Sequence, residues 1–366
     1  MPDLTSNNYP LLKSSLGKFL LDKILKSRLS FSLAVLFILV LQNIITTPDF
    51  FRITITNGLI SGYIPNILDQ GSCLVIVTLG MTLITAVAGG QDISVGAIMA
   101  VAASFCGVML NGPEYRSEVF HNPYALALIV GLLGGALCGA FNGFMVAVLN
   151  IQPMIASLIL YTSGRSIAKI ITYGQTVYVM NPVFKYLGVQ IPGIPVRTTI
   201  IVSTVMIALV VLAVKLTSLG LYLASIGINS SASRLVGLNS AVIKFMAFII
   251  CGVLAGVAGL VGSSGVGSVN AGELGMGIEL DAILAVALGG NMLGGGRFSI
   301  AGSVIGAYTI QAITTTLYAM NVRADQLYVF KAVIIVIIIV ISCDVFKERF
   351  RKLTRITFGK NAQAEG

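Results

Sequence analysis

The stretch LGMTLITAVAGGQDISVGAIMAVAA (79–103) consists of two apolar runs joined by a short polar break. Gly89 and Gly90 interrupt the first run, Asp92 follows without a basic residue beside it, and the second run begins at Ser94. A carboxylate near the centre of a bilayer costs about 2.5–3.5 kcal/mol, so Asp92 must face protein or water. The stretch therefore predicts two membrane helices with a break between them.

The same apolar character extends along the 366-residue chain, which is 56% hydrophobic and only 10% charged. A soluble domain carries about 25% charged residues, so a soluble globular fold is excluded. The mean hydropathy is +0.94. Because one spanning helix needs about 20 apolar residues, the chain has room for about ten spans and no separate soluble domain. We expect an all-α, polytopic integral membrane protein with broken or re-entrant segments.

The apolar segments predict one transmembrane domain over 29–346, flanked by polar, basic segments at 1–28 and 347–366. The predicted spans lie near 29–46, 71–88, 94–111, 124–148, 154–172, 198–214, 242–266, 280–293, 299–320 and 328–346. The stretch 53–68 is shorter and contains Gly and Pro, which favours an entry or re-entrant piece over a span.

The basic residues predict the orientation of this domain. The net charge is +9, and Lys and Arg are concentrated at the two ends of the chain. Cytoplasmic loops of membrane proteins carry the excess of Lys and Arg. Ten spans with both termini in the cytoplasm satisfy this rule, whereas nine or eleven spans would place one basic terminus outside.

The chain contains no recognisable catalytic or metal-binding motif. Its five cysteines show no CxxC spacing, and there is one histidine, so we expect neither a disulfide nor a metal site. The P-loop pattern GxxxxGK[ST] and the GxSxG and HExxH patterns are also missing from the sequence. We predict that the chain is not an enzyme and has no ATP site of its own.

Isolated polar residues within the apolar segments are the candidate functional groups. Asp92 has two compatible interpretations: it lines a polar pathway, or it caps the following helix together with Ser94. Arg165 and Lys169 are four residues apart and share a helix face, where they either extend toward a membrane interface or line an aqueous path.

Glycine spacing predicts close helix packing, because small residues let helix backbones approach each other in lipid. The glycines that recur at four-residue spacing are Gly131, Gly135, Gly139, Gly143, the pair Gly252/Gly256 and the pair Gly302/Gly306. The segments 80–102 and 280–307 share a plan of apolar run, Gly-Gly, polar break and small-residue helix. This plan suggests an internal repeat, which in transporters accompanies a transport pathway.

The interior loop 227–239 (GINSSASRLVGLN) is mildly amphipathic and lies on the predicted cytoplasmic side, within the wider connection 215–241. It predicts a short helix outside the membrane. Two interpretations stay open, a docking element for a cytoplasmic partner and an ordinary helix that lies on the lipid headgroups.

Taken together, these motifs resemble the permease subunits of bacterial ATP-binding-cassette (ABC) importers for monosaccharides, of the ribose/xylose/galactose type. The stretches that carry the resemblance are 79–103, 150–172, 227–259, 279–307 and the last apolar span, and the nearest similarity is to galactofuranose-type permeases. The chain departs from the usual pattern at Gln91, where the family has an apolar branched residue before the aspartate.

The resemblance implies a multi-pass protein of the bacterial inner membrane that imports a simple sugar by alternating access. It implies three kinds of partner: a second permease chain, identical or related, two cytoplasmic ATPase subunits that hold ATP and Mg, and an extracytoplasmic sugar-binding protein. The coupling element would be the 227–239 loop, with Asn229, Ser233, Arg234, Leu235 and Gly237. From polarity alone, the candidate pathway residues are Asp92, Ser94, Asn142, Gln152 and Asn291.

The sequence is also compatible with two functions other than that of an ABC permease. An ion- or proton-coupled secondary transporter would use titratable groups in the spans, which here are Asp92, Arg165 and Lys169. An intramembrane enzyme would need a pair of acids, and Asp92 with Asp281 is the one candidate pair.

Overall fold

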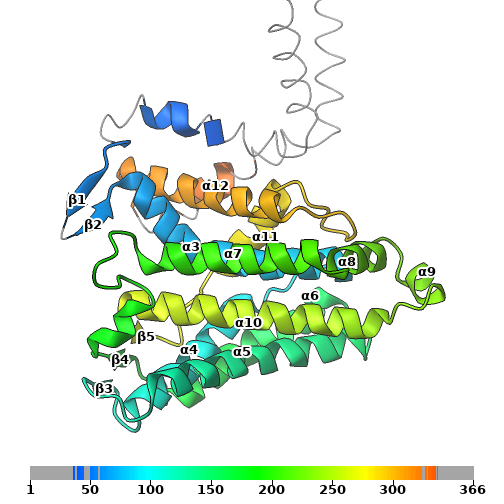
Figure 1. Ribbon diagram of the computed structural model, residues 1–366, viewed down its shortest axis with the longest axis horizontal. Coiled ribbons are helices and arrows are strands. Elements are labelled where there is room, and N and C mark those ends of the chain that lie inside the picture. Colours follow the sequence, from blue (N-terminus) through cyan, green and yellow to red (C-terminus); the bar gives the residue numbers. More distant parts are fainter. Residues whose placement is uncertain are drawn as a thin grey trace, which may run out of the picture.

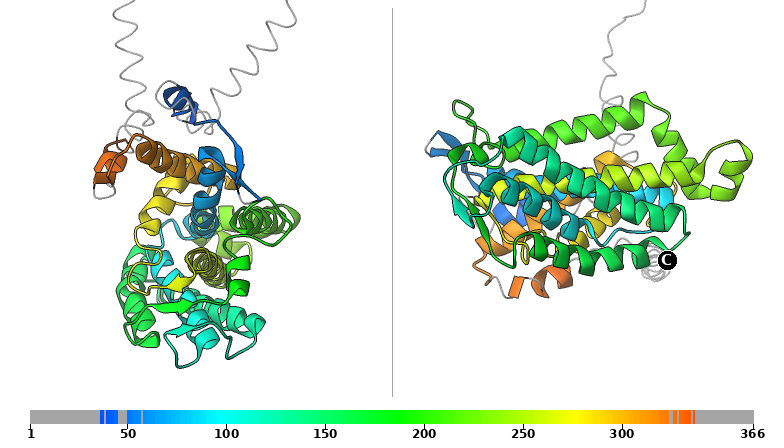
Figure 2. Two further views of the ribbon diagram at one scale, coloured as in Figure 1. Left: turned by 90° about the vertical axis from the view of Figure 1, so that its left-hand side faces the viewer. Right: turned by 90° about the horizontal axis from the view of Figure 1, so that it is seen from below.

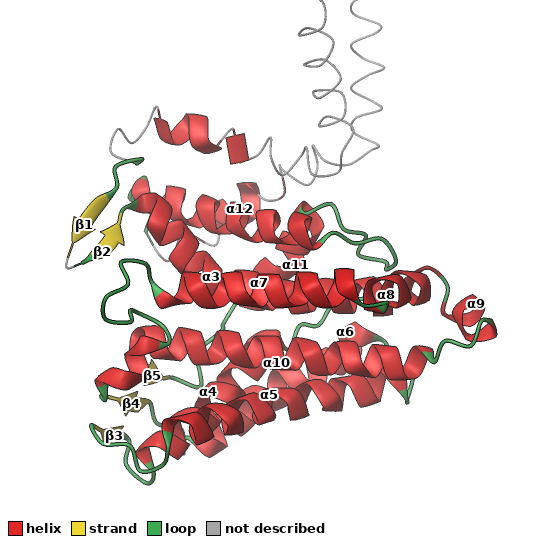
Figure 3. Cartoon of the chain, in the orientation of Figure 1, coloured by secondary structure: helices red, strands yellow, loops and turns green. Residues whose placement is uncertain are grey.

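The computed structural model of the protein describes residues 36, 37, 39–44, 50–56, 58–323, 326, 327, 329–334 and 336. Within these residues the chain forms a bundle whose long helices, such as α7 (Thr198–Leu216), α10 (Ser240–Val266) and α5 (Tyr124–Ala147), run roughly along one direction (Figure 1). The second view shows many of them end-on (Figure 2). The few short strands are confined to one end of the bundle, and the expected all-α membrane fold is confirmed (Figure 3).

Six helices are long and apolar enough to cross a membrane. They are α3 (Tyr63–Ala88), α5 (Tyr124–Ala147), α6 (Pro153–Ile171), α7 (Thr198–Leu216), α10 (Ser240–Val266) and α12 (Ile300–Ala319). Their positions match six of the ten predicted spans to within a few residues, apart from the earlier start of α3. The first and last predicted spans, 29–46 and 328–346, lie mostly outside the described residues.

Shorter helices complete the bundle. They are α4 (Val95–Asn111), α8 (Leu219–Ile228), α9 (Ser230–Leu235), α11 (Ile278–Leu288) and the single-turn η1 (Pro182–Tyr186). The predicted span at 280–293 is wrong as a span. At 1.5 Å per residue, the 11 residues of α11 extend for about 16 Å, about half of a 30 Å hydrocarbon core.

The end of the bundle opposite to α9 carries the strands. β1 (Thr54–Thr56) and β2 (Leu59–Ser61) form an antiparallel hairpin. β3 (Arg116–Ser117), β4 (Val177–Val179) and β5 (Ser268–Val269) form a small mixed sheet. Of the two forms expected for 53–68, the structure shows an entry and not a re-entrant piece: its first part is a hairpin that turns through Gly58 (φ 77°) and its second part begins α3.

The centre of the bundle is α3, which contacts α7, α8, α10, α11 and α12. Nearly all of its residues from Gly71 to Val87 are buried. By contrast, α7 buries only four residues. A helix that is apolar on every side lies either inside a bundle or against lipid. α3 is of the first kind and α7 is of the second.

The glycine repeat of α5 lies where α5 crosses α10. A Cβ placed on Gly139 would lie 2.4 Å from the carbonyl oxygen of Phe248, and one on Gly135 would lie 2.6 Å from that of Gly252. In α12, a Cβ on Gly306 would lie 2.1 Å from the carbonyl oxygen of Ala285 in α11. These helices approach each other backbone to backbone, as small residues permit.

Gly139→Ala is expected to lower the thermal stability of the detergent-solubilised chain by about 1–3 kcal/mol, the usual cost of overpacking. The matched control is Gly256→Ala in the same helix pair, where the nearest atom to the new Cβ would be 3.5 Å away. Melting curves from fluorescence-detected size exclusion measure both variants. Equal melting temperatures for the two variants would contradict the assigned α5–α10 contact.

Candidate functional site

A first buried polar cluster lies at the break between α3 and α4. Gly89 ends α3 in the left-handed region (φ 61°), where its N–H donates to the Thr85 carbonyl. Asp92 is 1% exposed, and its Oδ1 accepts hydrogen bonds from both the backbone N–H (2.8 Å) and the hydroxyl of Ser94. The Asp92 carboxylate therefore binds Ser94, the N-cap residue of α4. The Ser94 side chain makes no capping hydrogen bond to α4, so the cap expected from Asp92 and Ser94 together does not form.

Asn142 of α5 completes this cluster from another helix. Its Nδ2 donates to the Ser94 hydroxyl at 2.8 Å and lies 3.3 Å from Asp92 Oδ2, while its Oδ1 is buried without a partner. Three of the five candidate pathway residues thus lie in one place. An unpartnered buried amide oxygen is costly, so this cluster retains an acceptor that a donor group can use.

A second polar cluster surrounds Asn291, after the Gly-Gly pair that ends α11. The Asn291 amide donates to the Ser303 hydroxyl at 2.8 Å and to the Val286 carbonyl at 2.9 Å, and its Oδ1 accepts from the N–H of Ser299. Thr82 of α3 donates to the same Ser303 hydroxyl at 2.6 Å.

The two clusters contact adjacent residues of α3. The backbone N–H of Asp92 donates to Met81 Sδ at 3.3 Å, and Thr82 bonds Ser303 in the second cluster. Consecutive residues of a helix point about 100° apart, so the clusters lie on two different sides of α3. Each follows a Gly-Gly pair, in keeping with the repeat suggested by the sequence.

Gln152, the fifth candidate, lies apart from both clusters at the N-cap position of α6 and is exposed. The next residue, Pro153, packs on Gly90, where a Cβ would lie 3.0 Å from the proline ring. The 148–152 loop therefore abuts the α3–α4 break, although Gln152 itself points outward.

The structure also reveals buried charges that the sequence analysis did not assign. Asp69 of α3 is 5% exposed, forms an ion pair with Arg197 (3.2 Å) and accepts a hydrogen bond from the Thr199 hydroxyl. A cavity of about 350 Å³ adjoins Arg197 at the strand end of the bundle. The span predicted from residue 71 does not include Asp69. The signal that could identify Asp69 is a lone carboxylate within the apolar 63–88 helix.

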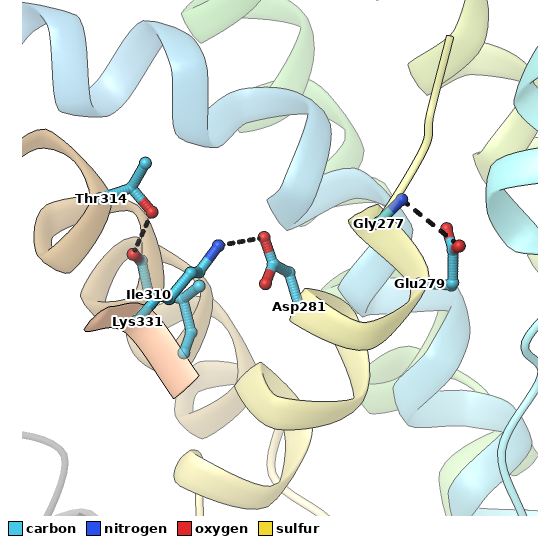
Figure 4. A network of polar contacts seen from close by, with 6 residues as sticks. All are labelled: Gly277, Glu279, Asp281, Ile310, Thr314 and Lys331. Atoms are coloured by element: carbon cyan, nitrogen blue, oxygen red, sulfur yellow. Dashed lines mark hydrogen bonds and ion pairs between the residues drawn. The ribbon is translucent and has the colours of Figure 1, made fainter. Parts of the chain in front are cut away.

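The two carboxylates of α11 point to opposite sides of that helix (Figure 4). Asp281 forms an ion pair with Lys331, while Glu279 is 3% exposed and accepts a hydrogen bond from the Gly277 N–H at 3.3 Å. Arg165 of α6 donates to the carbonyls of Gly272 and Leu274, at 3.3 and 3.2 Å. Asp281 and Asp92 thus have separate partners, and the acid pair that an intramembrane enzyme would need does not form among the described residues.

Removing one partner of the Asp281–Lys331 ion pair is expected to destabilise the protein more than removing both. The Lys331 side chain is 10% exposed and that of Asp281 is 25% exposed, and an uncompensated buried charge costs roughly 3–5 kcal/mol. Thermal melts of Lys331→Met, Asp281→Leu and the double variant measure this difference as a double-mutant cycle. A double variant as unstable as the sum of the singles would show that the pair is not coupled.

The α8–α9–α10 connection protrudes from the end of the bundle opposite to the strands (Figures 1 and 2). Asn229 ends α8 and caps α9, since its Oδ1 accepts from the Ala232 N–H at 2.9 Å. The Ser233 hydroxyl donates to the Asn229 carbonyl, and Arg234 Nε donates to Ser240 Oγ at 2.8 Å. Leu235 is 89% exposed and Gly237 (φ 86°) has open space around it.

This connection is packed directly against the helix breaks. A Cβ on Gly227 of α8 would lie 1.8 Å from the Ala86 carbonyl oxygen of α3 and 2.4 Å from the N–H nitrogen of Gly296. Gly296 in turn donates its N–H to the Ala86 carbonyl at 2.9 Å. Gly227 of α8 is therefore in direct contact with the end of α3, close to Asp92 in the chain, and with the loop between α11 and α12 that contains Asn291.

Residues 63–342 match the protein family described as branched-chain amino acid transport system, permease component. The chain is 32% identical to the galactofuranose transporter permease of Escherichia coli K12, over 86% of this chain and 89% of that protein. It is 33% identical to the fructose import permease of Bifidobacterium longum (89% and 90%) and 33% identical to the ribose import permease of Escherichia coli K12 (83% and 91%). No solved structure matches the chain.

Proposed function

Since this chain belongs to the family of permease components of bacterial import systems, we propose that it forms the translocation path for a simple sugar in an ABC importer. As a permease it is a multi-pass inner-membrane transport subunit and not itself an enzyme. The observation that supports this proposal most strongly is that three sugar permeases are similar to the chain over 83–89% of its length.

The two polar clusters on α3 support a neutral, hydroxyl-rich solute. They present amide, hydroxyl and carboxylate groups, with the Asn142 oxygen left unpartnered. Sugars are recognised through hydrogen bonds, and a path needs weak binding so that the solute can leave. We place Asp92, Ser94, Asn142 and Asn291 beside this path, and Gln152 at its cytoplasmic end.

The α9 connection is the proposed contact with the partner ATPases. It protrudes, asparagines cap the N-termini of α9 (Asn229) and of α10 (Asn239), and its base touches both helix breaks through Gly227. In the proposed cycle, closure of the two ATPases on ATP and Mg moves α9 and α8. That movement shifts the α3–α4 and α11–α12 breaks and switches the path from outward-open to inward-open.

The proposed assembly contains a second permease chain, two cytoplasmic ATPase subunits and an extracytoplasmic sugar-binding protein. Both termini are placed in the cytoplasm with α9. Affinity isolation of the full chain in mild detergent, with mass spectrometry and an ATP-hydrolysis assay, tests the assembly. Co-purification of a P-loop ATPase is expected, and repeated isolation of the chain alone after crosslinking would contradict the proposal.

A further inference from the structure

A wide groove lies at the α9 end, on the side of the bundle away from α5. It measures about 890 Å³ and lies between the C-terminal end of α7, the start of α8 and the start of α12. Both α7 and α12 pack on α3, which lies behind the groove. None of the functions proposed above uses this surface.

The groove is apolar in one part and basic in another. Its walls are apolar side chains, among them Val211, Val214, Leu221 and Ile300. Two cations line it: Lys215, in the last turn of α7, and Arg297, just before α12, and both are exposed. No carboxylate is among the described residues that line it.

In the orientation predicted from charge, the groove lies at the inner surface of the membrane. α7 ends and α12 begins there, and both are candidate spans. Val211 lies one helical turn before Lys215 and therefore on the same face, nearer to the membrane centre. The groove thus presents apolar walls at the depth of acyl chains and cations at the depth of headgroups.

We propose that this groove binds an anionic phospholipid of the cytoplasmic leaflet. The acyl chain packs on the α7, α8 and α12 side chains, and the phosphate group pairs with Lys215 and Arg297. Basic pockets between membrane helices on the cytoplasmic side attract such headgroups. The bound lipid would contact α7, α8 and the start of α12 at once. It would thereby restrain the position of α8, which leads to α9. This inference rests on the membrane fold and not on the transported solute.

The sequence provides a direct reporter, because the chain contains no tryptophan. Leu221 is 69% exposed in the groove, so Leu221→Trp introduces a single fluorophore there with little disturbance. The full chain is reconstituted in nanodiscs that contain brominated phosphatidylglycerol or brominated phosphatidylcholine, whose bromine atoms quench a neighbouring indole. Two basic side chains favour the anionic lipid by about 30-fold, at about 1 kcal/mol each.

The matched variants carry the same change in charge at opposite ends of the bundle. Lys215→Gln/Arg297→Gln is expected to abolish the preference for phosphatidylglycerol. The control Arg116→Gln/Lys185→Gln, at exposed positions near the strands, should keep it. Equal quenching by the two lipids in the reporter chain, or loss of preference in the control as well, would overturn the proposal.

Native mass spectrometry of the chain without the tryptophan provides a second test. The wild type and the control are expected to retain anionic phospholipid through purification, and the Lys215/Arg297 variant to lose it. Retention in all three chains would contradict the site. Shielding of the fluorophore from both brominated lipids in the complex isolated from membranes would show that a protein partner fills the groove, and would also reject the proposal.

Discussion

Arg234→Glu is expected to abolish ATP-driven uptake while the chain remains in the membrane at normal abundance. Arg234 Nε donates to Ser240 Oγ at 2.8 Å and so fixes the end of α9 to the start of α10. A carboxylate cannot donate this bond, and it reverses the charge on the surface proposed to meet the ATPases. Uptake in cells and ATP hydrolysis by the isolated complex measure the effect.

The control for this charge reversal is Arg116→Glu, an exposed position at the opposite end of the bundle, which should transport normally. Gly237→Val tests the same connection through the backbone. Gly237 and Gly193 both have positive φ (86° and 91°) and open surroundings, so valine strains each of them similarly. Loss of uptake in Gly237→Val but not in Gly193→Val is expected. Normal uptake in both Arg234→Glu and Gly237→Val would reject α9 as the coupling element.

Asp92→Leu is expected to abolish uptake and to destabilise the protein by several kcal/mol. It removes the acceptor for the Ser94 N–H and hydroxyl and for the Asn142 amide, and each buried unpaired group costs about 1–3 kcal/mol. Thermal melts and uptake measure the two effects separately.

Asp92→Asn separates the proposed importer from a proton-coupled transporter. The new amide still accepts from Ser94, and rotation of the Asn142 amide would offer its unpartnered Oδ1 to the new Nδ2. The fold and substantial uptake should therefore survive. Abolished uptake in a normally folded Asp92→Asn variant would show that a titrating carboxyl is needed, which is the requirement of the secondary-transporter alternative.

The sequence predicted elements better than it predicted contacts. Long apolar runs located the six candidate spans, and Gly-Gly pairs located both helix breaks. The span at 280–293 failed because an apolar run does not reveal that α11 ends at Leu288, where Gly289 approaches Gly302. The hairpin at 54–61 was missed because its strands have only three residues each, too few for a periodic pattern.

The candidate site could be predicted only in part, for a physical reason. An isolated polar residue in an apolar run must find a partner, which singled out Asp92, Asn142 and Asn291. Which partner it finds depends on helix packing: Asp92 meets Asn142 across 50 residues, and Thr82 meets Ser303 across 221. The spacing of residues within one helix does not predict these contacts between helices. The contact between Asp69 and Arg197 could not be predicted for the same reason.

Sugar uptake under separate control of ATP and the proton gradient tests the central claim most directly. Cells that express the chain with its binding protein and ATPases are given radiolabelled galactose, fructose or ribose. With ATP held constant, a protonophore is expected to leave uptake of the preferred sugar unchanged, and a variant ATPase that cannot hydrolyse ATP is expected to abolish it. Uptake that stops with the protonophore and persists with the inactive ATPase would contradict the account.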